Sequence, residues 1–385
     1  MRALLAFDKF KGSLTAAEAC AAVAGALRDR HPDWVIDSCP LADGGDGFAE
    51  ILTRAAGGTL HHLTVGGPRG EKVSAQFGLV PAARVPPAAR PLIGLAPPTG
   101  AGDIAVLELA QASGLARLAP LQRDPWLTST GGIGELIQAA ASRGVQAIIL
   151  GVGGSATNDL GLGALEALGL KFFAESGERL SPPTPATWAG VARIGGHVHT
   201  LPPLWVACDV DNPLLGRHGA ATVFGPQKGL RAEDLRRLEH LSARVAMMLG
   251  ARCRQPDSLM DLAGTGAAGG TAFGLRCAAG ARLVPGSALV AAWLNLDARI
   301  AASDVILTGE GCFDAGSLAG KGPGMVVSRA LAAGKAVSIF AGANQAASLP
   351  PGADLHLITP AGMPVAEAMR DAAANLAQTV RAAFA

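Results

Sequence analysis

The chain has 385 residues, of which 49% are hydrophobic and 16% are charged. This length exceeds that of one ordinary domain, so we expect two domains, and the composition excludes a generally disordered chain. Lys and Arg total 32 against 31 Asp and Glu, and the sequence has no basic stripe or aromatic platform, so no nucleic-acid partner is expected.

The apolar runs are short. None approaches the roughly 20 residues that span a bilayer. The run at the N-terminus is too short for the apolar core of a signal peptide, and no small-residue cleavage site follows it. We therefore expect a cytoplasmic protein with no membrane partner. The six cysteines lack C-x2-C spacing, so neither a zinc site nor a disulfide framework is predicted.

Apolar runs alternate with Ala-rich amphipathic stretches, which is typical of strands and helices in a mostly parallel sheet. Strands are predicted at residues 3–7 and 35–41. A helix over residues 15–30 follows the first strand, with Thr15 and Glu18 forming a capping box, and a second helix ends near Ala56.

The middle of the chain, residues 63–285, alternates in the same way. Strands are predicted at residues 147–152 and 203–208, with a helix at 160–168 between them. The stretch at 80–102 is rich in Pro, Ala and Gly, which predicts a long surface loop or a hairpin extension. We expect residues 63–285 to form an inserted second α/β domain.

The C-terminal part has predicted strands at 304–309, 336–342 and 355–359, with helices near 324–333 and 365–383. Together with the first two strands, these suffice for one doubly wound α/β domain built from both chain ends. The predicted domains are therefore residues 1–62 plus 286–385, and residues 63–285.

Four polar, glycine-rich turns follow predicted strands, where open α/β sheets bind their ligands. They cover residues 8–13, 42–47, 153–159 and 308–314, and the last is followed by Gly320-Lys321-Gly322. Glycine lets the backbone approach a ligand, and the N–H groups at a helix start favour phosphate. Lysine adds positive charge, while Asp and Glu can hold Mg²⁺ or accept a hydroxyl proton. This combination predicts phosphoryl transfer, whose catalysis is mainly positioning and charge neutralisation.

Each of these residues also has a plainer role open to it. A Gly-Gly pair can be a tight turn, an Asp can cap a helix, and Lys11 or Lys228 can be a solvated charge. Asp209 can likewise cap a turn. Neither G-x-x-x-x-G-K-[ST] nor an opening G-x-G-x-x-G occurs, which disfavours a P-loop and a standard dinucleotide fold.

Read together, the turns resemble those of the class I bacterial glycerate kinase family over essentially the whole chain. The matching strings are FKGS (10–13), ADGGDG (42–47), LELAQASGL (107–115), GELI (134–137), GGSATND (153–159), CDVDNPLLG (208–216), VFGPQKG (223–229), GAAGG (266–270) and TGEG (308–311). The resemblance implies ATP-dependent phosphorylation of glycerate, usually at the 2-hydroxyl, with ATP and Mg²⁺ as cofactors. It also implies a flavodoxin-like domain built from both chain ends, with a second α/β domain inserted.

The sequence departs from the family's usual strings at several places. Lys9 stands before Phe10 where Ser is typical, and Leu160 stands where the family usually has Gly. Residues 130–132 replace a Ser-Tyr-Gly-like segment, with Gly131 at the aromatic position. The string 314–317 has Gly316 in place of a Gln amide, which removes a hydrogen bond worth about 0.5–1.5 kcal/mol net. A different small hydroxy acid, such as tartronate or a sugar acid, therefore stays an alternative substrate, and a non-catalytic sensor stays an alternative function.

The resemblance, with the turn chemistry, gives a working set of site residues. Lys11 and Ser13 would bind the acid's carboxylate or the transferred phosphate, and Asp43 or Asp209 would orient or deprotonate the hydroxyl. Lys228 and Lys321 would neutralise phosphate charge. The remaining candidates for binding substrate or ATP are Asp8, Gly44, Gly45, Gly154, Ser155, Thr157, Asn158, Asp159, Asn212 and Gln227. Glu310 and Asp314 are candidates for Mg²⁺.

Overall fold

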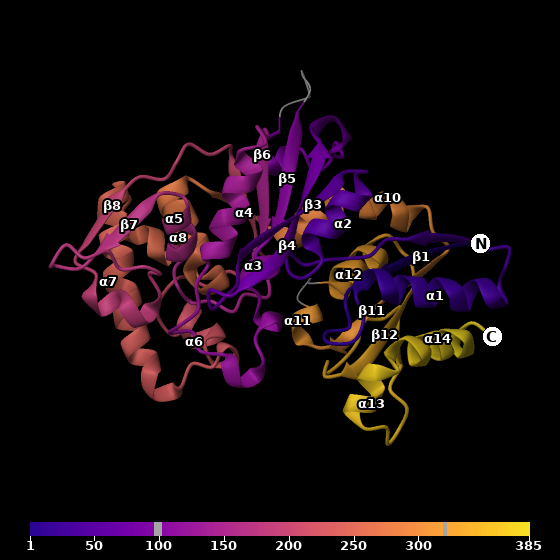
Figure 1. Cartoon of the computed structure of the whole chain (residues 1–385). Coiled ribbons are helices and arrows are strands. Elements are labelled where there is room, and N and C mark those ends of the chain that lie inside the picture. The colour runs from indigo at the N-terminus through magenta and orange to yellow at the C-terminus, as the bar shows by residue number, and fades with distance from the viewer. Residues whose placement is uncertain (96–101, 319–321) are drawn as a thin grey trace. The chain divides into compact units, whose positions relative to one another are not determined.

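A computed structural model describes residues 1–95, 102–318 and 322–385 of the chain (Figure 1). It divides into two compact units. Unit 1 joins Met1–Asp43 to Ser287–Ala385, and unit 2 is Gly44–Gly286. The predicted boundary lay after residue 62. Residues 44–62 belong with unit 2. Helix α2 (Phe48–Ala55) packs against strands β4 (Lys72–Pro81) and β5 (Asp103–Glu108) of that unit, and β3 (Thr59–Gly66) pairs with β4.

Unit 1 contains a five-stranded sheet in the order β13-β12-β11-β1-β2, with every neighbouring pair parallel. Its strands are β1 (Arg2–Phe7), β2 (Val35–Ser38), β11 (Val305–Phe313), β12 (Val337–Asn344) and β13 (Ala353–Leu357). Numbered within the unit, the order is 2-1-3-4-5, which is the flavodoxin-like order. The predicted doubly wound fold is confirmed, and its switch point lies between β1 and β11.

Helices cover both faces of this sheet. They are α1 (Ala16–Arg30), α9 (Gly286–Trp293), α10 (Leu296–Ala301), α11 (Ala315–Leu318), α12 (Pro323–Ala332), α13 (Val365–Arg370) and α14 (Ala372–Ala383). α1 and α14 pack side by side, as Figure 1 shows. Right-handed crossovers leave the switch point in opposite directions, which puts α1 and α12 on opposite faces. Because both faces are covered, β1 is buried from Ala3 to Phe7.

The predicted capping box at the start of α1 is confirmed. The Glu18 N–H donates to Thr15 Oγ1 at 3.2 Å, and the Glu18 carboxylate accepts the Thr15 N–H at 2.8 Å. The C-terminal helical stretch differs from the prediction, because α13 and α14 are separate helices that meet at Asp371.

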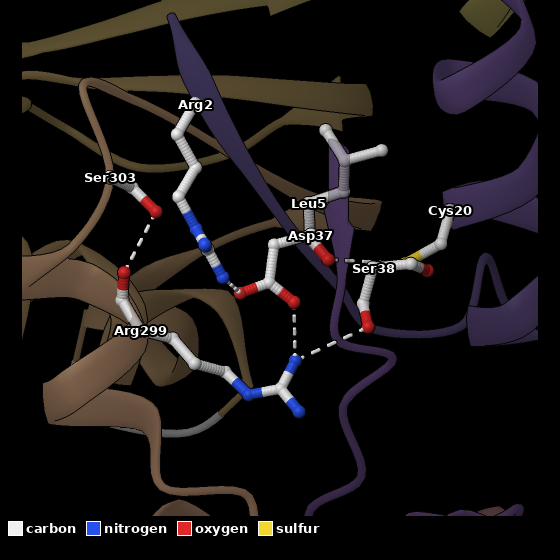
Figure 2. A network of polar contacts seen from close by, with 7 residues as sticks. All are labelled: Arg2, Leu5, Cys20, Asp37, Ser38, Arg299 and Ser303. Atoms are coloured by element: carbon white, nitrogen blue, oxygen red, sulfur yellow. Dashed lines mark hydrogen bonds and ion pairs between the residues drawn. The ribbon is translucent and has the colours of Figure 1, made fainter. Parts of the chain in front are cut away.

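Charged side chains join three elements of unit 1, as Figure 2 shows. Asp37 on β2 accepts a hydrogen bond from Arg2 on β1 at 2.9 Å and another from Arg299 on α10 at 2.7 Å. The Asp37 side chain is mostly buried, at 14% exposed, while both arginines are partly open to solvent. A carboxylate bonded to two guanidinium groups is among the stronger polar contacts in proteins, so Asp37 anchors β2, the edge strand.

Unit 2 contains a six-stranded sheet in the order β10-β9-β6-β5-β4-β3. The strands are β3 (Thr59–Gly66), β4 (Lys72–Pro81), β5 (Asp103–Glu108), β6 (Ala147–Gly151), β9 (Leu204–Ala207) and β10 (Arg282–Val284). The pairs from β5 to β10 are parallel, whereas β3-β4 and β4-β5 are antiparallel. The expected parallel α/β character therefore holds for four strands, and an antiparallel edge is added to it.

In the rest of unit 2, some helices pack on this sheet and others pack on one another. Its helices are α2 (Phe48–Ala55), α3 (Ala110–Ser113), α4 (Gly131–Ala141), α5 (Leu162–Ala167), α6 (Ala220–Phe224), α7 (Leu235–Cys253) and α8 (Ala267–Ala279), and a small hairpin joins β7 (Leu170–Phe173) to β8 (Arg193–Gly196). Among the helices that the structure describes, none combines the length and apolar character that crossing a bilayer requires.

The Pro-rich stretch predicted as a loop or hairpin extension connects β4 to β5, which are antiparallel neighbours, so its described part is a hairpin connection. It is not a bare surface loop, because Val85, Ala89 and Ile93 are buried. Residues 96–101 lie outside the described ranges.

Candidate functional site

The first candidate group follows β1, beside the switch point of unit 1. Asp8 is buried, and its N–H donates to the Gly309 carbonyl of β11 at 3.0 Å. The Lys9 N–H donates to Asp8 Oδ1 at 2.7 Å. The Lys9 ammonium lies 3.8 Å from Asp8 Oδ1 and 3.5 Å from Asp43 Oδ1. Lys9, which departs from the family's usual Ser, thus places a positive charge between two candidate acids.

Lys11 and Ser13 belong to a tight turn that follows. The Phe10 N–H donates to the Leu14 carbonyl at 2.8 Å, and the Ser13 hydroxyl donates to the Phe10 carbonyl at 3.1 Å. Phe10 is buried and anchors the turn, whereas Lys11 is exposed. This exposure agrees with the plainer role of Lys11 as a solvated charge, and it also leaves its ammonium accessible to an anionic ligand.

Glu310 and Asp314 come from β11 and the residues after it. The predicted turn at 308–314 is wrong in part, because β11 continues to Phe313, which pairs with Asn344 of β12. Glu310 is half-buried. Burial raises its pKa to about 7, with a further rise from the carboxylates of Asp8, Asp314 and Asp43. Glu310 is therefore part of strand β11, although the strand predicted from the sequence ended at Gly309.

Asp314 also has a structural role. Its Oδ1 accepts the N–H groups of Gly316 at 2.7 Å and Ser317 at 3.0 Å. These are the bonds of a helix cap at the start of α11. Asp314 therefore caps a helix, which is the plainer role open to an Asp, and one of its two carboxylate oxygens is already hydrogen-bonded.

The donors at this place suit Mg²⁺ in one respect. Mg²⁺ is usually held by one or two carboxylates together with substrate phosphates. Glu310 Oε1 is a buried oxygen with no hydrogen-bond partner among the described residues, so it is an available hard ligand. Those residues contain no cluster of three or more His, Cys, Asp or Glu that could bind a metal by themselves. Lys321 lies outside the described residues.

In unit 2, residues 44–47 of the second predicted turn pack against the turn at 153–159. The Gly153 N–H donates to the Gly44 carbonyl at 2.9 Å. A Cβ added to Gly153 would lie 2.5 Å from the Cα of Gly45, so only glycine permits this approach. The carboxylate of Asp46 lies over the second turn, with Oδ1 3.1 Å from the position of a Cβ on Gly154. Two of the predicted turns are thus brought together, including Gly44, Gly45 and Gly154.

Lys228 holds the 153–159 turn. Its side chain is 2% exposed, and its ammonium donates to Ser155 Oγ at 2.9 Å and to the Thr157 carbonyl at 2.6 Å. Burial lowers the pKa of Lys228 to about 7, against a smaller opposing effect of Asp159. The alternative of an exposed loop charge is wrong, because the lysine points into the protein. Here its ammonium acts on the turn itself.

The acids and amides of this turn are also buried. Asp159 Oδ2 accepts the N–H and the hydroxyl of Thr130 at 2.7 and 2.8 Å, and Oδ1 accepts the Gly161 N–H at 3.1 Å. Burial raises the pKa of Asp159 in spite of these bonds. Within the part of the chain that the structure describes, Thr157 Oγ1 and Asn158 Oδ1 are buried without a hydrogen-bond partner.

The loop after β9 contributes three more candidates. Asp209 is half-buried two residues beyond the strand. Asn212 Nδ2 donates to the His218 carbonyl at 2.7 Å, so this amide closes its own loop. Gln227 is exposed on the short 3-10 turn Pro226–Lys228.

Sequence reasoning missed two acids beside these turns. Asp46 lies in the family-like string at 42–47 and Glu108 in the string at 107–115, but neither was predicted as a site residue. Glu108 is the last residue of β5 and is almost completely buried. The sequence did contain a signal for Glu108, because an acidic residue at the carboxyl end of a buried strand is rare unless it is paired.

Comparisons with known proteins agree with the resemblance. The model of the glycerate kinase family matches residues 3–385. A glycerate kinase from Haemophilus influenzae is 37% identical over 348 residues, covering 89% of this chain and 86% of the relative. A glycerate 2-kinase from Escherichia coli K12 is 35% identical over 337 residues, covering 84% and 80%.

A solved structure is similar along the whole fold. The crystal structure of a protein assigned as glycerate kinase 2 from Salmonella typhimurium LT2 is 35% identical, with a TM-score of 0.75, and the match covers 100% of this chain and 97% of that one. The family model, the relatives and the fold all agree, and the chain therefore belongs to the glycerate kinase family.

Proposed function

We propose that this kinase transfers the γ-phosphoryl group of ATP to the 2-hydroxyl of D-glycerate, giving 2-phosphoglycerate and ADP. The observation that carries the proposal is the family match along residues 3–385. The name of the E. coli relative, glycerate 2-kinase, supports the position. Carboxylates and lysines at the carboxyl ends of parallel strands, where open α/β sheets bind ligands, support the reaction class.

In this reaction the 2-hydroxyl oxygen forms a bond to the γ-phosphorus, and the bond from that phosphorus to the β–γ bridging oxygen breaks. The hydroxyl proton passes to a carboxylate, for which Asp43 and Asp209 are the candidates. Lys11 is exposed on its turn and suits the carboxylate of glycerate or the moving phosphate. Lys228 acts through the 153–159 turn, which its ammonium holds.

Mg²⁺ would be held by Glu310, through its unpartnered oxygen, and by the second oxygen of Asp314. When bound, the ion supplies neutralisation of charge on the phosphates. The residues themselves orient the substrates: Ser13 and Lys11 belong to a turn whose backbone is fixed by its own hydrogen bonds.

Phosphorus and proton NMR of the product formed from ATP and D-glycerate tests the proposal directly. We expect the phosphorus to couple to the proton on C2. Coupling to the protons on C3 would overturn the position, and the absence of any phosphorylated product would overturn the function.

A panel of small hydroxy acids tests the substrate, because Gly316 offers no side-chain amide to orient one. ADP release should show the highest kcat/KM for D-glycerate. A higher value for tartronate or a sugar acid would replace glycerate as the substrate. Binding of ATP and glycerate in calorimetry, without ADP release, would instead favour the sensor.

A further inference from the structure

The carboxyl group of Glu108 is buried at the end of β5 and is bonded to the start of a helix from a distant part of the sequence. Its Oε2 accepts the N–H of Gly47 at 3.0 Å and the N–H of Ala49 at 3.3 Å. Its side chain is 1% exposed. An acid so deeply buried is tolerated when it is hydrogen-bonded, and these two N–H groups supply the bonds.

The helix that Glu108 reaches has no side-chain cap of its own. α2 begins after Gly47, whose φ of 93° lies in the left-handed region, and no side-chain oxygen of the cap residue bonds its first turn. Ser, Thr, Asn and Asp, which normally cap helices, do so from an extended backbone. Since the turn requires glycine here, the capping oxygen has to come from elsewhere, and it comes from β5.

The capped turn is the one that packs on the 153–159 turn. The Gly44 carbonyl accepts the Gly153 N–H, and a Cβ on Gly151 would lie 2.6 Å from the same carbonyl oxygen. Gly151 pairs with Glu108 in the parallel register of β5 and β6. The turn at 44–47 is therefore held at its first residue by β6 and the following turn, and at its last residue by Glu108.

Asp46 lies between these two attachments. It is half-buried, with its carboxylate over Gly154. The groups facing Glu108 are the Asp46 carboxylate, the Gln111 side chain and the two N–H groups of α2. Burial, with a further rise from Asp46, brings the pKa of Glu108 to about 7.

We propose that Glu108 is a positioning residue for phosphoryl transfer, which fixes the 44–47 turn and orients the carboxylate of Asp46 toward the reacting groups. This inference rests on the proposed function. Glu108 acts through the turn, and Asp46 is the side chain whose placement it controls. Charge on Glu108 strengthens its bonds to the helix N–H groups, but it also places a second negative charge beside Asp46.

The test compares Glu108→Gln and Glu108→Ala with a control on the same helix, Glu50→Gln. Glu50 forms a surface ion pair with Arg54 at 2.7 Å, so its loss should change little. The measurements are kcat, KM for both substrates, the pH profile of kcat between 6 and 8.5, and the exchange rates of the Gly47 and Ala49 amide protons.

We expect Glu108→Ala to lower kcat at least 10-fold and to speed exchange of both amides at least 10-fold. Glu108→Gln keeps an oxygen that accepts the N–H groups, so kcat should recover to within about 3-fold of wild type. It cannot titrate, so the change of kcat between pH 6 and 8.5 that we expect of wild type and Glu50→Gln should be smaller in this variant. Glu310 and Lys228, whose pKa values also lie at about 7, keep their own contribution to the profile in all variants.

Two results would overturn the inference. In one, Glu108→Ala folds and keeps kcat within 2-fold. In the other, Glu108→Gln shows the same change of kcat with pH as wild type. If Glu108→Ala does not fold, the pH profile of Glu108→Gln decides. If wild type phosphorylates no hydroxy acid, the proposed function fails by itself, and the amide exchange rates still report whether Glu108 holds the turn.

Discussion

Lys228→Met replaces a buried ammonium by an apolar side chain of similar length. The unperturbed pKa of lysine is 10.5, and burial lowers that of Lys228 to about 7. At pH 7 the unfolded chain keeps this lysine fully protonated, while the folded chain holds about half a proton on it. Retaining the charge in the fold therefore costs about 4 kcal/mol at that pH.

The opposing effect is the loss of two hydrogen bonds. Without Lys228, the Ser155 hydroxyl and the Thr157 carbonyl lose their donor, at about 1–3 kcal/mol each. The two contributions nearly cancel at pH 7. We expect Lys228→Met to lie within about 2 kcal/mol of wild type there, since replacing a buried charge by an apolar group is often neutral.

The pH dependence separates the two contributions. Between pH 7 and 10.5 the unfolded state binds more protons than the folded state, so wild type gains stability as the pH rises. From pH 7 to 10 this gain amounts to about 3 kcal/mol, and Lys228→Met lacks it. Lys228→Met should therefore become less stable than wild type as the pH rises. In wild type the neutral amine of Lys228 still donates hydrogen bonds to the turn, and the cost of burying its charge is gone.

Urea denaturation at pH 7, 8, 9 and 10 measures the difference between the two proteins, so other titrating groups cancel. Lys171→Met is the control, because Lys171 is exposed in the same unit. If wild type and Lys228→Met show parallel pH dependences over this range, the lysine does not titrate as its burial requires and the reasoning is refuted.

Three further substitutions test separate parts of the account. Lys11→Ala should lower kcat at least 100-fold and leave stability within about 0.5 kcal/mol, because the side chain is exposed; near-wild-type kcat would remove it from the site. Asp37→Asn should cost about 1–3 kcal/mol in denaturant unfolding, since Arg2 and Arg299 both lose a charged partner, with kcat unchanged; an unchanged midpoint would contradict this. Leu160→Gly relieves a left-handed backbone conformation, worth about 1–2 kcal/mol, but removes a buried side chain, worth about 2–5 kcal/mol. We therefore expect a net loss of stability in denaturant unfolding, and a stabilised variant would mean that the backbone strain dominates.

Local patterns that depend on neighbouring residues were predictable from the sequence. The capping box of Thr15 and Glu18 is a spacing of three residues, and it forms as predicted. The alternation of short apolar runs with helices predicted the parallel strands β1, β6, β9 and β12, because strands buried on both faces are continuously apolar. The turns after these strands, and the family that they indicate, could also be recognised from the sequence, because their motifs consist of neighbouring residues.

The strands β3 and β4 were not identified, because half-exposed strands such as Thr59–Gly66 carry a weaker pattern. The extension of β11 to Phe313 was also missed. Pairing with β12 stabilises residues 310–313 as strand, although their glycine and acid content is typical of a turn.

The glycine-rich turns show most clearly what the sequence determines and what the tertiary structure adds. The sequence by itself identifies where the backbone can approach closely and which polar side chains lie there. It does not reveal which of these side chains the fold buries. Lys228 is closed inside the 153–159 turn and Glu108 caps a helix 61 residues away, because burial and partners depend on which distant segments pack together. Those contacts, rather than residue type, set the charge of each group and whether it holds the site or meets a ligand.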